Sequence, residues 1–179
     1  MEVEAAAAPP SGGGSPLFTP DLTLLRAGDG AALPGLPASD SPVVIVLFSA
    51  AWCPACARFV PMLADFHDEI GGSVPVVVIS RDKSEEDWRA ALTADHIPDS
   101  WLSLDWSLRD YAARLEMALG VTGVPSVAVL RVADSAIVSA VSTARAEIVK
   151  GPPSAVLTKW TGDAVDRKDL PALPPLAGE

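Results

Sequence analysis

The chain has 179 residues, of which 49% are hydrophobic and 20% charged, which suits one globular domain with extra sequence at its ends. Thirteen basic against 23 acidic residues give a formal net charge of −10, so we expect no nucleic-acid partner. The longest purely apolar run, Val43 to Phe48, is far shorter than the roughly 20 residues of a membrane-spanning helix, so no membrane association is expected.

Both ends of the chain are predicted to lie outside the folded domain. Residues 1–20 are rich in Ala, Pro, Gly and Ser and lack apolar periodicity, which predicts a disordered segment. This segment also lacks the basic start and long apolar stretch of a secretory signal, which favours a cytoplasmic location. Residues 164–179 are predicted to form a proline-rich tail, so the domain is expected to span residues 21–163.

The first predicted elements lie on either side of the two cysteines. The run "PVVIVLF" at 42–48 is apolar on both faces, which is typical of a central strand covered by helices on both sides. A helix is expected from Pro54 to about residue 70, with a kink at Pro61. Its apolar face consists of Phe59, Leu63, Phe66 and Ile70, and Gly71-Gly72 supplies the stop.

The remaining elements continue the alternation. A second central strand is predicted at 74–80, followed by a helix that begins at a capping box of Ser84 and Asp87. A third helix with apolar residues from Leu108 to Leu119 ends at Gly120. The runs at 126–132 and 136–141 indicate an antiparallel hairpin at the edge of the sheet. This order predicts an α/β fold with a mixed central β-sheet flanked by helices on both faces.

The segment "WCPAC" places the two cysteines at the start of the first helix. The unpaired N–H groups there would stabilise Cys53 as a thiolate, and Pro54 suits the first helical turn, where a backbone donor is not needed. Cys56 lies one turn further on, so it is expected beneath Cys53. This spacing predicts that Cys53 attacks a substrate disulfide and that Cys56 resolves the mixed disulfide that results.

Three other roles are open for the cysteine pair. A structural disulfide would close too short a loop to stabilise the fold much, and the two cysteines could also be inert core residues. A zinc site would need His67 and His96, but their spacing from the cysteines matches no compact zinc motif. We therefore favour disulfide exchange, with no metal and no bound cofactor, and expect both histidines to be surface or packing residues.

A second signal is "GVP", in which Pro125 immediately precedes a predicted strand. If the bond between Val124 and Pro125 is cis, the carbonyl and amide of Val124 are exposed for pairing with an extended substrate. A trans proline that merely starts the strand is the usual alternative.

Together these motifs resemble the thioredoxin superfamily, in which the proline of "GVP" is cis. The similarity is greater to its tryparedoxin and nucleoredoxin branch, whose members have "SASWCPPC" where this chain has "SAAWCPAC". Residues 24–30 are similar to the N-terminal strand and turn of that branch, Trp101-Leu102 to the segment after a helix, and residues 143–152 to the last strand. The resemblance covers roughly residues 22–160.

The resemblance implies a monomeric thiol-disulfide oxidoreductase. Tryparedoxins take electrons from a low-molecular-weight dithiol, trypanothione, and pass them to oxidised proteins such as peroxidases. In this chain Trp52 would cover the cysteine pair, Pro125 would dock the substrate, and Arg145 matches an arginine thought to meet a carboxylate of trypanothione. The structural alternative for Arg145 is an exposed arginine in an edge strand.

Two departures from the family pattern bear on the chemistry. Arg81-Asp82-Lys83 stands where tryparedoxins have Trp-Asp-Glu, and this is closer to nucleoredoxins. Leu47 occupies the position of the buried aspartate of thioredoxins, so another group or water must accept the proton of the resolving thiol. The main alternative function is a non-catalytic thioredoxin-like module that binds partners or senses redox state. A cytochrome-maturation type of extracytoplasmic reductase is disfavoured by the N-terminal sequence.

Overall fold

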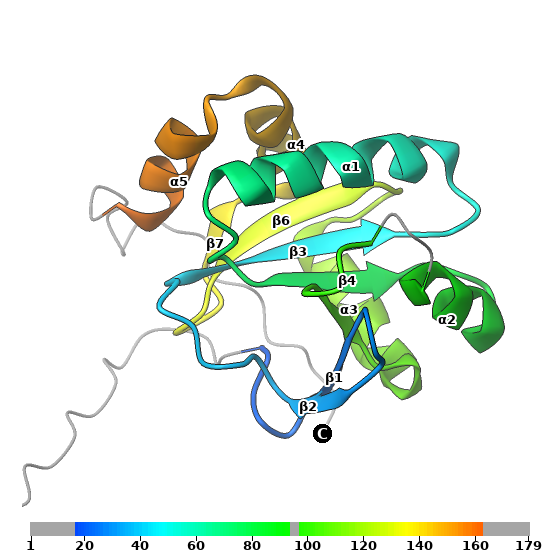
Figure 1. Ribbon diagram of the computed structural model, residues 1–179. Helices are drawn as coiled ribbons and strands as arrows, with labels where there is room; N and C mark the ends of the chain where they lie inside the picture. Colours follow the sequence, from blue (N-terminus) through cyan, green and yellow to red (C-terminus); the bar gives the residue numbers. More distant parts are fainter. Residues whose placement is uncertain (1–16, 94–96, 163–179) are drawn as a thin grey trace, which may run out of the picture.

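The computed structural model describes residues 17–93 and 97–162, which form a seven-stranded sheet with helices on both faces (Figure 1). The strand order is β2-β1-β5-β4-β3-β6-β7. β3 pairs in parallel with β4, and β4 with β5, while the other neighbours are antiparallel. The strands are β1 (Thr23–Arg26), β2 (Ala32–Pro34), β3 (Val43–Ser49), β4 (Val76–Ser80), β5 (Leu102–Leu104), β6 (Ser126–Arg131) and β7 (Ile137–Ser139).

The helices complete a layered α/β arrangement. α1, α4 and α5 lie on one face of the sheet, and α3 lies on the other (Figure 1). The predicted mixed sheet with helices on both faces is confirmed. The helices are α1 (Pro54–Glu69), α2 (Glu85–Thr93), α3 (Arg109–Leu119), α4 (Val141–Lys150) and α5 (Pro153–Thr161), with the short 3-10 helix η1 (Trp106–Leu108) before α3.

The central strand β3 supplies side chains to both layers of the core. Successive residues of a strand point to opposite faces, and every residue of β3 is buried. Ile45 and Leu47 belong to the cluster that includes Leu63 of α1, whereas Val44 belongs to the cluster that includes Leu115 of α3. Burial on both faces explains why this strand is a continuous apolar run instead of an alternating one.

Helix α1 has the expected start and stop. Pro54 is its first residue, directly after Cys53, and the helix continues past Pro61. It ends at Ile70, after which Gly71 and Gly72 adopt φ values of 82° and 65°, a region that glycine enters without steric cost. The sequence signals therefore fix the end of the helix that carries both cysteines. The kink at Pro61 stays a prediction.

Three further local signals are confirmed. The N–H of Asp87 donates to Ser84 Oγ at 3.1 Å, which caps the start of α2. Helix α3 ends at Gly120, whose φ is 68°. β6 and β7 form the expected antiparallel hairpin, with a register irregularity at Val129 and Leu130.

The prediction of a strand at residues 143–152 is wrong, because this segment lies mainly in helix α4. Ala144 and Ile148 are one helical turn apart, and both are buried in the core cluster that includes α1. Glu147 connects α4 to β7 and α5. Its Oε2 accepts hydrogen bonds from Ser139 Oγ at 2.6 Å and from Trp160 Nε1 at 2.9 Å. Burial alone would raise the pKa of Glu147, but hydrogen bonds from Lys159, Ser139 and Trp160 hold it below its usual value.

The first described residues pack onto the domain. Leu17 and Phe18, which fall inside the segment predicted to be disordered, are buried against the α3 side of the core. The Leu17 N–H donates to Ser135 Oγ at 2.8 Å, and the Tyr111 hydroxyl donates to the Leu17 carbonyl at 2.7 Å. Residues 1–16 of that segment, and the predicted tail from 164, lie outside the described residues. Within 17–93 and 97–162, every helix is too short or too polar to cross a bilayer.

Candidate functional site

The two cysteines lie where β3 ends and α1 begins. Cys53 is the N-cap of α1, and its Sγ accepts a hydrogen bond from the Cys56 N–H at 3.2 Å. Both cysteines are free thiols, with 5% of Cys53 and 1% of Cys56 exposed. The sulfur that is nearer to solvent therefore lies at the start of the helix, with a backbone N–H directed at it. The predicted position of the pair is confirmed.

Burial keeps Cys56 in its protonated form. It raises the pKa of the Cys56 thiol from 9.0 to about 11, and the hydrogen bond with Cys53 adds to the effect. At neutral pH nearly every molecule therefore carries a Cys56 thiol, which is a poor nucleophile. Any reaction in which Cys56 attacks must first remove this proton.

Cys56 should make the reduced protein less stable in alkaline solution. A thiol with a higher pKa in the folded chain contributes stability that is complete below pH 9 and is lost as the pH rises through 11. Urea unfolding with reductant at pH 8 and pH 11 tests this. We expect the free energy of unfolding to fall by about 2 kcal/mol more in the natural chain than in Cys56→Ser. Equal losses in the two proteins would show that the thiol is not perturbed.

The loop before β6 lies against the cysteine pair. The bond between Val124 and Pro125 is cis, so the trans alternative is wrong. The Cys53 thiol lies 3.6 Å from the Val124 carbonyl oxygen, within hydrogen-bonding distance for sulfur. Val124 also packs on the small apolar cluster of Ala50, Cys53 and Cys56. The geometry brings Val124, the residue before the cis proline, to the Cys53 sulfur, and substrate pairing there stays a prediction.

Three other predicted site residues lie on α1 or near it. Trp52 is 57% exposed, and its Nε1 donates to the Arg81 carbonyl at 3.2 Å. Pro54 is exposed on the first turn of α1. Arg145 is an exposed residue of helix α4 and not of an edge strand, and its guanidinium carbon lies 5.4 Å from the centre of the Phe59 ring on α1. The functions of all three stay predictions.

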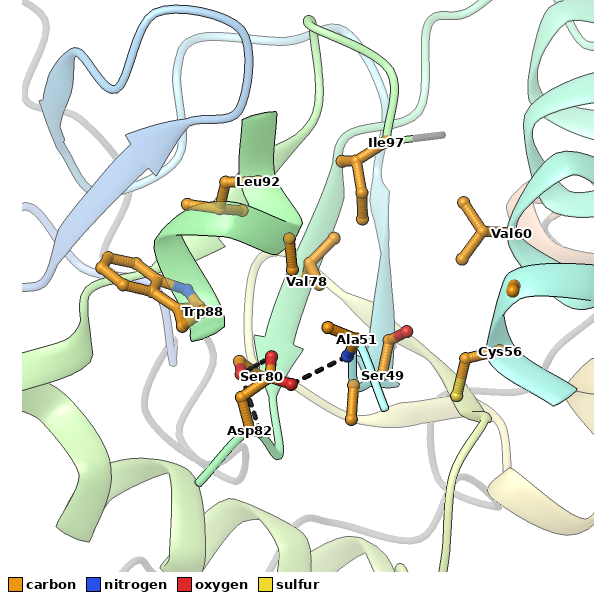
Figure 2. A pocket seen from close by; sticks show the side chains of 13 residues that line it. Ser49, Ala51, Cys56, Val60, Val78, Ser80, Asp82, Trp88, Leu92 and Ile97 are labelled. Carbon is orange, nitrogen blue, oxygen red and sulfur yellow. Dashed lines mark hydrogen bonds between the residues drawn. The ribbon is translucent and has the colours of Figure 1, made fainter. Parts of the chain in front are cut away.

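Sequence reasoning missed Asp82 as a site residue. Asp82 is 3% exposed and shares a cavity with Cys56 (Figure 2). Leu47, in contrast, is fully buried in the core. The available signal was the position of Asp82 two residues after β4, which pairs in parallel with β3. The carboxyl ends of adjacent parallel strands meet at one edge of a sheet, so Asp82 and the cysteine loop after β3 had to be neighbours.

His67 is a packing residue. Its Nε2 lies 2.8 Å from the Val74 carbonyl oxygen, and its ring meets the edge of the Trp101 ring at 5.9 Å between centroids. His96 lies outside the described residues. In the part of the chain that the structure covers, no group of three or more His, Cys, Asp and Glu side chains is arranged to hold a metal ion.

Comparisons with known proteins agree with this geometry. Residues 41–136 match the family described as thioredoxin-like. The tryparedoxin of Trypanosoma brucei brucei is 31% identical over 114 residues, which cover 63% of this chain and 75% of that protein. Nucleoredoxin from Xenopus laevis is 30% identical over 94 residues, which are 51% of this chain but only 22% of that longer protein.

Solved structures show the same likeness. Tryparedoxin II from C. fasciculata superimposes with a TM-score of 0.64 and 28% identity, covering 76% of this chain and 90% of that one. A tryparedoxin II complexed with glutathionylspermidine superimposes with the same TM-score and 27% identity, covering 74% of this chain and 88% of that one. The chain therefore belongs to the thioredoxin-like family and is a distant homologue of tryparedoxin and nucleoredoxin.

Proposed function

We propose that this protein is a thiol-disulfide oxidoreductase of tryparedoxin type, a carrier that reduces disulfides of partner proteins with its own dithiol. One observation carries the proposal. Cys53 lies at the first turn of α1 with its sulfur accepting the Cys56 N–H, next to the carbonyl that precedes the cis proline. Such a sulfur has a donor that stabilises its anion and an open backbone group beside it for a substrate.

The reaction then follows from the positions of the two sulfurs. The Cys53 thiolate attacks one sulfur of the substrate disulfide and releases the other as a thiolate, which takes a proton from solvent. Cys56 loses its proton and attacks Cys53 Sγ, which forms the Cys53–Cys56 disulfide and releases the second substrate thiolate. The substrate gains two electrons and the protein loses two. A dithiol donor returns the pair to the reduced state by the same exchange steps.

The partners are proposed from the likeness and from the surface beside Cys53. The glutathionylspermidine bound by a tryparedoxin II supports a low-molecular-weight thiol donor of the trypanothione class. Arg145 offers a guanidinium that suits a carboxylate of such a donor, and Val124 with Pro125 offers a backbone edge for an oxidised protein such as a peroxidase. Trp52 covers the cysteine pair. We propose a monomer that acts in the cytoplasm without a cofactor.

Measuring the electron donor tests this proposal. The purified protein would be offered trypanothione, glutathione or a thioredoxin reductase system, with insulin as the disulfide acceptor. We expect turnover with a dithiol donor and little with the monothiol glutathione, because a dithiol closes its own disulfide and completes the exchange. If reduced protein transfers no electrons to insulin with any of the three donors, the proposal is wrong.

A non-catalytic thioredoxin-like module is the second candidate. It is favoured by Leu47, which fills with an apolar side chain the position where thioredoxins bury an acid. Such a module would bind partners at the surface beside Cys53 without turnover. Stable complexes combined with no detectable disulfide reduction would favour it over the carrier.

A further inference from the structure

A cavity of about 70 Å³ lies between the carboxyl ends of β3 and β4, helix α2 and the start of α1 (Figure 2). Its polar lining is formed by Cys56, Ser49, Ser80 and Asp82, while much of the rest is apolar. A site that holds one water needs about 10–15 Å³ by this measure, so the cavity has room for a few. It therefore joins the buried thiol to the buried carboxylate through a space that water can occupy.

Cys56 and Asp82 are connected along one edge of this cavity. Cys56 and Ser49 line the cavity together, and the Ser49 side chain partly offsets the effect of burial on the pKa of the Cys56 thiol. Ser49 is the register partner of Ser80 across the parallel strands, and Ser80 Oγ donates to Asp82 Oδ2 at 2.6 Å. Hydroxyl groups both donate and accept, so water in the cavity together with the two serines can relay a proton from Cys56 to Asp82.

Hydrogen bonds hold the Asp82 carboxylate in a fixed position beside this cavity. Its Oδ1 accepts the Ala51 N–H at 2.8 Å, and its own N–H donates to Ser80 Oγ at 2.9 Å. These bonds fix the carboxylate inside the domain, with 3% of the residue exposed. Figure 2 shows Asp82 and Ser80 entering the site from the β4 side and Cys56 from the start of α1.

We propose that Asp82 accepts the proton of the Cys56 thiol, through the water and serine hydroxyls of this cavity, when Cys56 resolves the mixed disulfide on Cys53. The inference rests on the proposed function. The Cys56 proton passes to the Asp82 carboxylate, Cys56 Sγ bonds to Cys53 Sγ, and the bond from Cys53 to the substrate sulfur breaks. The released substrate thiolate then takes up a proton from solvent, and Asp82 returns its proton to solvent. Asp82 thus supplies the acceptor that Leu47 cannot.

Few charged groups compete for this role. Among the described residues that line the cavity, Cys56 and Asp82 are the two with titratable side chains. The cavity residues from α2 are Trp88, Ala91 and Leu92. Arg81 and Lys83 flank Asp82 along the chain, and Arg81 pairs with Glu116 at 3.5 Å.

The test separates attack by Cys53 from resolution by Cys56. A chromogenic disulfide, dithiobis(nitrobenzoate), is mixed with reduced protein, and release of its coloured thiol is followed by stopped flow. The first equivalent reports attack and the second reports resolution. The variant is Asp82→Asn, which keeps an oxygen for the Ala51 N–H but cannot take the proton. Asp65→Asn is the matched control, since Asp65 is an exposed aspartate of α1.

We expect Asp82→Asn to slow the second release about 100-fold at pH 7, within the range for general base catalysis, and to change the first release less than about threefold. The natural chain and Asp65→Asn should resolve at nearly constant rates from pH 6 to 9. In Asp82→Asn the rate of the second release should rise about tenfold per pH unit. Without the carboxylate, Cys56 loses its proton only to solvent, and the fraction of Cys56 thiolate then rises about tenfold with each pH unit.

Each other outcome overturns the inference. Equal second-release rates and pH profiles in Asp82→Asn and the natural chain would show that Asp82 takes no proton. Equal slowing of both releases with an unchanged pH profile would show that Asp82 only holds the Ala51 loop. If the natural chain releases one equivalent and never the second, Cys56 does not resolve, and the proposed function fails together with this inference.

Discussion

Cys53→Ser is expected to lower the rate of insulin disulfide reduction by about three orders of magnitude or more, because a serine hydroxyl does not ionise at the helix start and cannot attack a disulfide. Serine is close in size to cysteine, and its hydroxyl can accept the Cys56 N–H that Cys53 Sγ accepts now. The variant should therefore fold like the natural chain. Turbidity from reduced insulin, measured with excess dithiol donor, gives the rate.

Two measurements make the Cys53→Ser result decisive. Urea unfolding should place the variant within about 1 kcal/mol of the reduced natural chain, so that lost activity does not reflect lost folding. The Cys56→Ser variant should still react once per molecule with a disulfide but should not turn over. Full turnover by Cys53→Ser would rule out its assignment as the nucleophile.

Leu63→Ala should be the most damaging of the simple packing changes in α1. Leu63 has no exposed surface and packs between α1 and the sheet, and removal of such a side chain typically costs 2–5 kcal/mol, with about 3 kcal/mol expected here. Met62→Ala is the matched control. Met62 is the preceding residue of the same helix, is 44% exposed, and should cost less than about 1 kcal/mol.

The two α1 variants also test how the helix positions the cysteines. Urea unfolding gives the free energies, and dithiobis(nitrobenzoate) gives the rate of Cys53 attack in each folded variant. Leu63 lies two turns after Cys56, so its loss should destabilise the helix on the sheet more than it changes the local turn at Cys53. If Leu63→Ala and Met62→Ala lower the free energy of unfolding equally, α1 does not pack on the sheet as described.

Local sequence signals were sufficient for the elements that form the site. The strand before the cysteines is buried on both faces, and such a strand appears in sequence as an unbroken apolar run. The helix after it has a proline at its first position and two glycines at its end, each with a direct conformational reason. These signals placed Cys53 at a helix start, the position on which the proposed chemistry of the pair depends.

Three features were not predicted correctly from the sequence. Family likeness predicts a strand at residues 143–152, yet the one-turn spacing of Ala144 and Ile148 fits a helix packed on α1. The short strands β2 and β5 have three residues each, too few to show a period. Leu17 and Phe18 fall inside the low-complexity segment, and only their packing in the core cluster that includes α3 shows that they are core residues.

Asp82, the proposed proton acceptor, was missed because its place depends on sheet topology. Asp82 is far from Cys56 in sequence, and a single aspartate after a strand is usually a turn residue. Its role depends on the parallel register that places Ser80 beside Ser49. That register follows from the sheet topology and not from any property of residues 80–82 alone.

The central claim is that the sulfur of Cys53 attacks and that the sulfur of Cys56 resolves. Mass spectrometry of peptides from Cys56→Ser, after reaction with oxidised insulin or another protein disulfide, measures this directly. We predict a stable mixed disulfide on Cys53, and no comparable adduct on Cys56 when Cys53→Ser is treated in the same way. Adducts that form on Cys56 as fast as on Cys53 would contradict the account.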